Sequence, residues 1–232
     1  MLGPGANVVL QRVILIKNHN TCKICSADTT TVEDKKFELN YYYCGQCRYI
    51  SVEEKAIISA EEEEALYRQH NNTLENEGYV KMFEKFIRTA IEPYGGELRQ
   101  ALDFGCGPGP VLATLLEQRG FEVDIYDPYF APQRVYAGKS YGLITATEVF
   151  EHLKDPLKTA ALLRDHLHKK GILALMTLFH PGEEEQFLKW WYRHDPTHIS
   201  FYRPETLEVL AHKLGLKVLT FDSKNICVLA KQ

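Results

Sequence analysis

Ten residues near the middle of the chain, Ala101 to Pro110, constrain its fold more than any other stretch. Residues 101–104 have the pattern of a short buried strand, and glycine then occurs at 105, 107 and 109. Pro110 suits the first turn of a helix that continues to Gly120. A strand, a glycine-rich turn and a helix direct backbone N–H groups at a ligand, because no Cβ atoms keep the ligand away. The stretch therefore predicts a ligand-binding turn in an α/β fold.

The nature of that ligand follows from the glycine spacing and from one acid. The spacing is Gly-x-Gly-x-Gly, so the chain lacks the Gly-x-Gly-x-x-Gly fingerprint of dinucleotide-binding folds. Asp103 lies within the motif, just before the first glycine. A carboxylate at this point would repel a pyrophosphate but would hold an ammonium group. We therefore expect a zwitterionic ligand rather than a diphosphate.

The stretch resembles the first motif of the class I S-adenosylmethionine-dependent methyltransferases, which has the form apolar-apolar-acid-apolar-Gly-x-Gly-x-Gly. Two later segments extend the resemblance. Phe121 to Asp127 has the pattern of a second strand ending in an acid, and Tyr141 to Thr147 that of a third, followed by Glu148 to Pro156, which is similar to the family's post-strand motif. The resemblance covers residues from about 95 to 232. It implies an α/β, Rossmann-like sheet with helices on both faces and S-adenosylmethionine as cofactor.

The resemblance also implies the residues that bind this cofactor, with the family's acid at Asp127 bonding the ribose hydroxyls. The implied set is Asp103, Gly105, Cys106, Gly107, Gly109, Asp127, Pro128, Thr147 and Glu148. Tyr67 and His70 join it, because the segment around them resembles that of a bacterial methyltransferase group with a cysteine-rich front end. In such enzymes this segment commonly folds over the cofactor. Helix capping and a plain loop remain the alternative for these two residues.

One departure from the family pattern concerns the adenine contacts. Only about a dozen residues separate Asp127 from the strand at Tyr141, where relatives usually have a helix and a further strand. That region usually supplies an acid for the adenine amine, and none occurs between Pro128 and Tyr141. The sequence therefore predicts no residue for this contact.

Four of the six cysteines form two Cys-x-x-Cys pairs, Cys22 with Cys25 and Cys44 with Cys47. Their separation matches the spacing of tetrathiolate zinc ribbons, and four thiolates leave no open position for water or substrate. We therefore predict a structural zinc ion. Two disulfides are the alternative, which a reducing cytoplasm disfavours, and a thioredoxin-like redox motif would need only one pair. We interpret Cys106 and Cys227 as small buried hydrophobic residues.

These patterns divide the chain into three parts. Residues 1–58 are predicted to form a zinc-ribbon-like module, with strand-like runs at 8–10 and 13–16. Residues 59–94 form a helical connector and cofactor lid, in which Ser59 caps a first helix and residues 82–91 have helical spacing. Residues 95–232 form the S-adenosylmethionine-binding methyltransferase domain, including a turn at Lys169–Gly171 before a strand at 172–178.

Three residues are predicted to act in catalysis. Glu148 follows a strand whose end should face the cofactor, and His152 lies one helical turn further on. His198 belongs to an insertion at 179–203 whose aromatic and histidine content suggests the wall of a substrate pocket. A neutral histidine is a suitable base near pH 7. Two alternatives remain: the histidines are packing or helix-end residues, or Glu148, Glu151, His152 and His198 bind a divalent cation, as a similar set does in some O-methyltransferases.

Composition limits the partners of the chain. The net charge of −4 argues against a general nucleic-acid binder. No apolar run approaches the roughly 18 residues of a membrane span, and the N-terminus lacks the pattern of a signal peptide. We therefore expect a cytoplasmic transferase without membrane or evident protein partners. A small-molecule acceptor is the leading prediction, by resemblance to sugar C-methyltransferases that carry an N-terminal zinc module. The alternatives are an RNA methyltransferase that docks its substrate through the zinc module, and a non-catalytic S-adenosylmethionine-binding protein.

Overall fold

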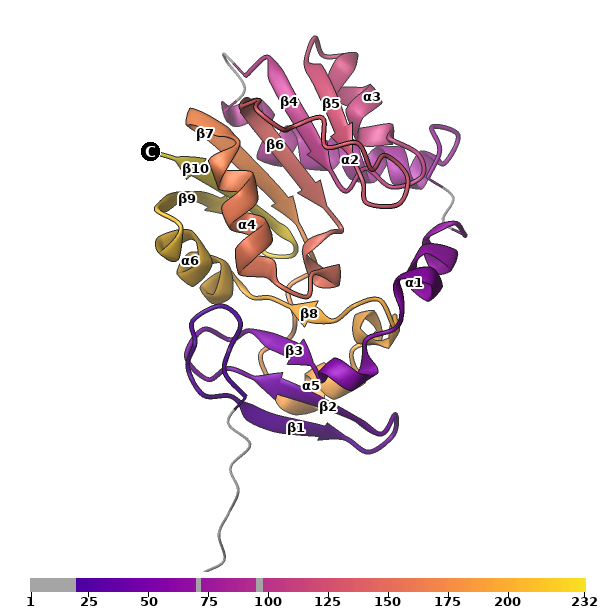
Figure 1. Ribbon diagram of the computed structural model, residues 1–232, viewed down its shortest axis with the longest axis vertical. Coiled ribbons are helices and arrows are strands. Elements are labelled where there is room, and N and C mark those ends of the chain that lie inside the picture. Colours follow the sequence, from indigo (N-terminus) through magenta and orange to yellow (C-terminus); the bar gives the residue numbers. More distant parts are fainter. Residues whose placement is uncertain (1–19, 70–71, 95–97) are drawn as a thin grey trace, which may run out of the picture.

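The computed structural model describes residues 20–69, 72–94 and 98–232. The strand-like runs predicted at 8–10 and 13–16, and His70, lie outside these residues. The described chain forms two sheets, with strand orders β5-β4-β6-β7-β10-β9 and β1-β2-β3-β8 (Figure 1). The strands are β1 (Thr30–Asp34), β2 (Leu39–Tyr43), β3 (Ile50–Val52), β4 (Gln100–Phe104), β5 (Glu122–Tyr126), β6 (Tyr141–Thr147), β7 (Leu167–Met176), β8 (Ser200–Phe201), β9 (Leu216–Phe221) and β10 (Ile226–Lys231). The helices are α1 (Ala60–Tyr67), α2 (Glu77–Ala90), α3 (Val111–Glu117), α4 (Pro156–Asp165), α5 (Glu184–Lys189) and α6 (Pro204–Lys213), with 3₁₀ turns η1 (Glu54–Ala56), η2 (Glu92–Tyr94), η3 (Phe150–His152) and η4 (Trp191–His194).

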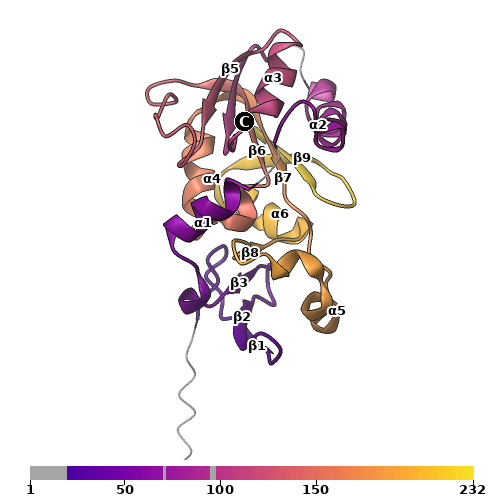
Figure 2. The same cartoon turned by 90° about the vertical axis from the view of Figure 1, so that its right-hand side faces the viewer.

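The larger sheet has the expected α/β architecture. Strands β5, β4, β6 and β7 are parallel, whereas β10 runs antiparallel to both β7 and β9. Consecutive residues of each strand face opposite sides, and both sides are buried. Ala101 and Leu143 face a core formed with α2 and α3, while Leu102 and Ile144 face a core formed with α4 and α6. Figure 2 shows α2 and α4 on opposite sides of this sheet.

The loop after β5 confirms the departure predicted from the sequence. Residues 128–140 contain no helix or strand, and the chain turns back at once through an antiparallel bridge between Asp127 and Ala131. As a result β5 lies at the edge of the sheet. The first residues of the loop, Pro128 to Phe130, lie at the carboxyl end of β5, on the side of the sheet where ligands bind in open α/β folds.

The turn predicted at Lys169–Gly171 is absorbed into a strand. β7 begins already at Leu167 and is interrupted by a bulge: the register passes from Tyr141 opposite Leu167 to Leu143 opposite Ile172. Lys170 takes up the extra length with a φ of 66°. Lys169, Lys170 and Gly171 suggested a turn because a bulge, like a turn, interrupts the regular strand conformation of the backbone.

The smaller sheet joins segments that are far apart in the sequence. β3 pairs antiparallel with β8, which brings Ile50 opposite Phe201 and Ser51 opposite Ser200. The predicted cysteine module and the insertion at 179–203 thus share one sheet. Figure 1 shows β8 between β3 and the larger sheet. The two segments also share a core, in which the ring of Tyr41 contacts the rings of Phe187 and Phe201.

The connector between the two sheets consists of α1 and α2. Ser59 caps α1 through a reciprocal pair of hydrogen bonds with Glu62, as its position predicted. α2 buries Phe83, Phe86 and Ile87 on one side, which is the face that the helical spacing predicted. None of the helices in the described ranges has both the length and the apolar character of a membrane-spanning segment.

Candidate active site

A cavity of about 500 Å³ lies at the carboxyl ends of β4, β5 and β6. Every predicted cofactor-binding or catalytic residue within the described ranges lines it. These residues are Tyr67, Asp103, Gly105, Cys106, Gly107, Gly109, Asp127, Pro128, Thr147, Glu148, His152 and His198. Their roles stay predictions, but the fold brings all of them to one place.

The glycine turn forms one wall of this cavity. Gly105 and Gly107 have φ angles of 81° and 66°, which residues with side chains rarely adopt. A Cβ atom on Gly109 would lie 1.8 Å from the carbonyl oxygen of Asn72. The connector therefore packs directly on the turn, and this close approach requires glycine.

Asp103 lies at the bottom of the cavity and is 2% exposed. The Thr145 hydroxyl donates a hydrogen bond to it over 2.8 Å. Burial raises the pKa of the Asp103 carboxyl to about 6. A carboxylate that is poorly solvated and lacks a nearby cation gains strongly from a positively charged ligand group.

Asp127 connects the glycine turn to the loop after β5. One carboxylate oxygen, Oδ2, accepts a hydrogen bond from the N–H of Gly107 over 3.0 Å. The other, Oδ1, accepts from the N–H groups of Tyr129 and Phe130 over 2.8 and 3.0 Å. A carboxylate has about four acceptor positions, so Asp127 retains capacity for a ligand hydroxyl.

The connector lines one side of the cavity, and its role as a cofactor lid stays a prediction. Tyr67, Asn72, Tyr79 and Phe83 line the cavity from this side. The hydroxyls of Tyr67 and of Tyr129, from the opposite loop, both donate hydrogen bonds to Glu63. The connector and the loop after β5 are thus held together by one carboxylate.

Glu148 lies at the transition from β6 to η3 in a strained conformation. Its φ is 53°, in the left-handed region that non-glycine residues seldom occupy, and such residues cluster at functional sites. More than a third of its surface is accessible, and it lines the cavity. The surrounding protein atoms and the nearby Glu151 carboxyl raise the pKa of Glu148 well above its usual range. The Tyr192 hydroxyl lies within hydrogen-bond reach of both carboxyls.

The two histidines meet at the same end of the cavity. Their ring centroids are 4.8 Å apart, although His152 belongs to η3 and His198 to the insertion. His152 Nδ1 is 3.0 Å from the carbonyl oxygen of Thr197, and His198 Nδ1 is 2.7 Å from that of Tyr192. Burial, with the neighbouring His152, lowers the pKa of His198 and so favours the neutral ring.

Several residues of the cavity were not predicted as site residues. In the sequence, a polar loop and an apolar helix face were the only patterns that included Asn72, Tyr79 and Phe83. The aromatic insertion was the only pattern that included Trp191, Tyr192 and Asp195. Trp191, 68% exposed, lies at the opening. Their positions depend on contacts between distant segments, which no local pattern in the sequence reveals.

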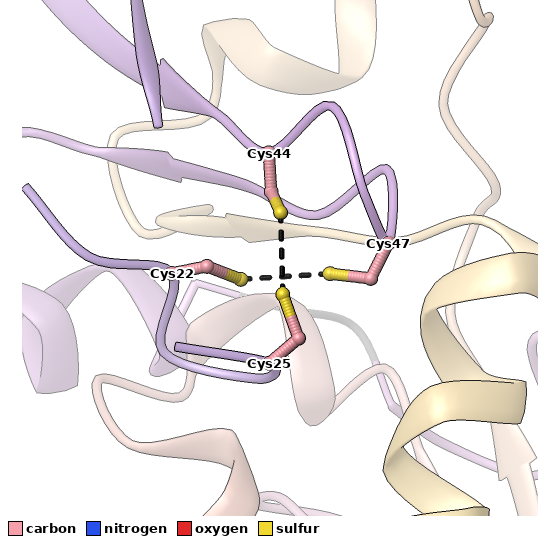
Figure 3. A group of neighbouring side chains, drawn as sticks. All are labelled: Cys22, Cys25, Cys44 and Cys47. Carbon is pink, nitrogen blue, oxygen red and sulfur yellow. Dashed lines mark hydrogen bonds between the residues drawn. The ribbon is translucent and has the colours of Figure 1, made fainter. Parts of the chain in front are cut away.

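The four paired cysteines form a cluster outside this cavity. Their sulfur atoms converge on one point, and all lie within 4.8 Å of one another (Figure 3). The Sγ–Sγ distances are 3.5 Å for Cys22 and Cys47 and 3.4 Å for Cys25 and Cys44. A disulfide bond would require about 2.05 Å. The cluster is compatible with a zinc-ribbon module.

The two cysteine pairs have the same backbone geometry. In each, the N–H of the first cysteine donates to the carbonyl five residues later, in Ala27 and in Tyr49. The residue after the second cysteine, Ser26 or Arg48, has a positive φ of 66° or 64°. Two equivalent turns thus present four sulfurs from opposite sides, which is what a tetrahedral ion requires.

Three consecutive residues of the second turn contact the insertion at 179–203 and α6. Cys47 O accepts a hydrogen bond from the Thr206 hydroxyl over 2.8 Å, and Arg48 O lies 2.7 Å from His180 Nε2. The Tyr49 hydroxyl is 2.7 Å from Ser200 Oγ, which donates to the carbonyl of Leu153, directly after η3. The cysteine cluster is therefore two hydrogen bonds away from the turn that carries His152.

Comparison with known proteins agrees with this fold. The methyltransferase-domain family model matches residues 75–220, more than half of the chain. The chain has no match among curated proteins. An O-methyltransferase family protein from Burkholderia thailandensis has a similar structure, with a TM-score of 0.54 at 10% identity over 73% of this chain and 62% of that chain.

Two further solved structures share the fold. CalO1, a methyltransferase in calicheamicin biosynthesis in its SAH-bound form, has a TM-score of 0.50 at 18% identity, over 75% of this chain and 59% of that chain. The magnesium protoporphyrin IX methyltransferase ChlM from Synechocystis PCC 6803, with bound SAH, has a TM-score of 0.50 at 14% identity, over 77% and 97%. The chain spans less than two thirds of the Burkholderia and CalO1 chains. The family match, over more than half of the chain, shows that the chain belongs to the methyltransferase-domain family, and the solved structures share its fold.

Proposed function

We propose that the protein methylates a small molecule, which binds between the glycine turn and the insertion at 179–203. The observation that carries this proposal is a single cavity that extends from the glycine turn to Trp191, Tyr192 and His198. Its volume of about 500 Å³ falls within the range of small-molecule sites. The aromatic side chains at its far end suit a largely apolar or planar acceptor.

The residues on the glycine side fit the cofactor. Asp103 offers a buried carboxyl to the ammonium group, and Asp127 offers acceptor capacity to the ribose hydroxyls. Tyr129 and Phe130 line the region in which relatives carry an acid, so aromatic contact would replace that acid at the adenine. When bound, S-adenosylmethionine supplies a methyl group on a positively charged sulfur, which an electron pair of the acceptor displaces.

The expected position of the acceptor is bordered by Glu148, His152 and His198. Their task is to align the acceptor, to exclude water and to take up its proton. Each histidine ring has one nitrogen directed to a backbone carbonyl, which fixes the ring and leaves the other nitrogen as an acceptor. The Tyr192 hydroxyl donates a hydrogen bond to Glu148 Oε2 and thereby orients this carboxyl group.

Charge favours a small molecule over RNA. Residues 1–60 contain seven lysines and arginines against six aspartates and glutamates. This small excess of positive charge does not suit binding along a phosphate backbone. The first turns of α1 carry Glu61 to Glu64, and Glu63 lines the cavity. A phosphate backbone at this opening would meet like charge.

We further infer that Cys22, Cys25, Cys44 and Cys47 hold one structural zinc ion. Zinc–sulfur bonds of about 2.3 Å in a tetrahedron place the sulfurs about 3.8 Å apart, close to the two distances of 3.4 and 3.5 Å. Elemental analysis of protein purified without chelator should give one zinc per chain. A zinc content near zero, or thiols that fail to react because they are paired in disulfides, would contradict this inference.

The acceptor class is tested by labelling. The protein is incubated with methyl-labelled S-adenosylmethionine and cell extract separated into small-molecule, RNA and protein fractions. We expect label in the small-molecule fraction only. The control is Gly109→Ala, whose Cβ would collide with Asn72, matched by Gly45→Ala, whose Cβ would meet no atom within 4 Å. Label in RNA or protein would overturn the proposal, and cofactor binding without any labelled product would favour the non-catalytic alternative.

A further inference from the structure

If the protein acts on a small molecule as proposed above, we infer that this acceptor is an amine on a planar or apolar body, and that Asp195 and His198 hold its ammonium group. Both side chains line the cavity and belong to the insertion at 179–203. Together they offer hydrogen-bond acceptors for which the described part of the chain supplies no donor. An ammonium group would supply the missing N–H groups.

The two acceptor atoms lie side by side. His198 Nε2 is 3.9 Å from Asp195 Oδ2, which is too far for a hydrogen bond between them. The carbonyl oxygen of Tyr192 can only accept, so His198 Nδ1 carries the proton and Nε2 has a free lone pair. Among the described residues, no donor reaches either atom. An amine nitrogen about 2.9 Å from each would fit between them.

The charge of this pair favours a cation over a neutral donor. Asp195 Oδ1 accepts hydrogen bonds from the N–H and the hydroxyl of Thr197 over 2.9 and 2.6 Å. Burial raises the pKa of the Asp195 carboxyl, but these hydrogen bonds outweigh burial and hold the pKa below its usual range. The His198 side chain is only 10% exposed, and its lowered pKa favours the neutral ring. The pair is thus negative, and hydrogen bonds between charged groups are the stronger ones.

The rest of the cavity has the same preference. Within the described ranges no lysine or arginine lines it, whereas these acids do: Glu63, Asp103, Asp127, Glu148 and Asp195. Asp103 and Asp127 suit the ammonium group and the ribose of the cofactor, and the others remain for further ligand groups. A phosphate or carboxylate on the acceptor would meet like charge. A wholly apolar acceptor would remove water from these carboxyls without replacing its hydrogen bonds, which is costly.

Aromatic rings in mutual contact form a wall of the cavity. Successive ring centroids are 4.0–5.8 Å apart. From the loop after β5 to the opening, the rings are Tyr129, Tyr67, His152, His198, Tyr192 and Trp191. The faces of tyrosine and tryptophan rings attract an ammonium group within about 6 Å, and the same rings pack well on a planar molecule. An amine on a planar body would use both properties.

The same arrangement makes the amine nitrogen the methylated atom. His198 Nε2 takes one proton from the ammonium group, which gives the nitrogen a free electron pair. The bond from nitrogen to the methyl carbon forms as the bond from that carbon to sulfur breaks, and the electron pair of the broken bond stays on sulfur. His198 then releases its proton to water. Asp195 keeps its charge and holds the methylated ammonium group.

Separation of the acceptor by charge tests the class of substrate. The small-molecule fraction of the cell extract is passed over a cation exchanger at pH 7, and the bound and unbound portions are each incubated with the protein and methyl-labelled S-adenosylmethionine. We expect labelled product from the bound portion only, and we expect that product to stay cationic. Labelled product from the unbound portion overturns the amine. Absence of label from both portions overturns the proposed function itself, so the two failures give different results.

A binding measurement without turnover uses 2-phenylethylamine and 2-phenylethanol, which differ only in an ammonium group against a hydroxyl. The chain has two tryptophans, so Trp190→Phe leaves Trp191, at the opening of the cavity, as the single reporter. Its fluorescence is followed in protein loaded with S-adenosylhomocysteine. We expect the amine to bind at least tenfold more tightly than the alcohol. An alcohol that binds as well as the amine overturns the inference.

Asp195→Asn, in the same Trp190→Phe protein, tests the residue that holds the amine. Asparagine keeps an oxygen for the two hydrogen bonds from Thr197 but removes the charge, so the turn should fold as before. The preference for the amine should fall below about threefold, while S-adenosylmethionine affinity stays within about threefold. The matched control is Glu61→Gln, because Glu61 is exposed on α1 and lies outside the cavity. An amine preference that is equal in the two variants overturns the role of Asp195.

Discussion

The two ends of the cavity are built in different ways. The glycine end comes from one continuous strand and turn together with the tip of the neighbouring strand, and backbone geometry dominates it. The acceptor end combines η3, the insertion at 179–203 and the connector, and it depends on side chains. Because β8 pairs with β3, this end is also continuous with the cysteine module. A site made of local backbone is insensitive to the rest of the fold, whereas a site assembled from distant segments depends on whatever holds them together.

The largest expected effect is on turnover. His198→Ala should lower turnover of the labelled acceptor by about 10²–10⁴-fold, the range of a lost general base. Cofactor affinity should stay within about threefold, because His198 belongs to the acceptor end alone. Single-turnover kinetics and calorimetric titration measure the two effects. Turnover that also stays within about threefold would remove His198 from catalysis.

The next effect concerns the attachment of the insertion. Arg193 Nη1 and Asp34 Oδ2 form an ion pair at 2.5 Å, with side chains only 1% and 5% exposed. Asp34→Asn leaves the Arg193 charge buried and unpaired, which should cost about 3–5 kcal/mol of unfolding free energy. Denaturant titration measures it. The control is Glu54→Gln, whose pairs with Lys23 and Lys154 are exposed and contribute about 1 kcal/mol or less. Equal losses in both variants would mean that the ion pair does not anchor the insertion.

A smaller effect is expected at the glycine end. Asp127→Asn should weaken S-adenosylmethionine binding by about 1.5–3 kcal/mol, the scale of hydrogen bonds to a charged group. Asp124→Asn, in the strand β5 that precedes Asp127 but outside the cavity, is the matched control. Calorimetry that gives equal cofactor affinity for the two variants would contradict the role of Asp127.

The smallest effect is a pH dependence. The pKa of Asp103 is raised to about 6, so this carboxyl is neutral below that pH and cannot attract an ammonium group. Cofactor affinity should be level near pH 7 and fall by up to tenfold per unit below pH 6. For folding the sign is opposite: an acid with a raised pKa stabilises the folded state most below about pH 4, and this contribution is lost as pH rises to 6. Affinities measured from pH 5 to 7 should lose this slope in Asp103→Asn.

The same contrast explains what the sequence could predict. The glycine turn, β5, β6 and α6 follow from local apolar patterns and from proline and glycine positions, and their bounds agree closely with the structure. The lack of an acid for the adenine amine could also be predicted, because the segment between Asp127 and Tyr141 is too short to contain the helix and strand that usually supply it. Such features need only a few consecutive residues.

The acceptor end could be predicted only in part. An aromatic insertion predicts a wall, but not that β8 would join β3, because a two-residue strand has no pattern of its own. The strained Glu148 is a consequence of tertiary packing. The bulge in β7 looked like a turn because only the partner strand reveals which of the two forms.

The pairing of β3 with β8 also has a consequence for synthesis on the ribosome. Tyr49 and Ser200 are 151 residues apart, which corresponds to about 8–30 s at about 5–20 residues per second. During this interval the four cysteines have already emerged, but Thr206, His180 and Ser200, which bind the second cysteine turn, have not. The outer edge of β3 stays open for the same time, and open edges invite pairing with other chains. The cysteine module is therefore synthesised as an incomplete sheet, which is completed only when β8, in the last third of the chain, pairs with β3.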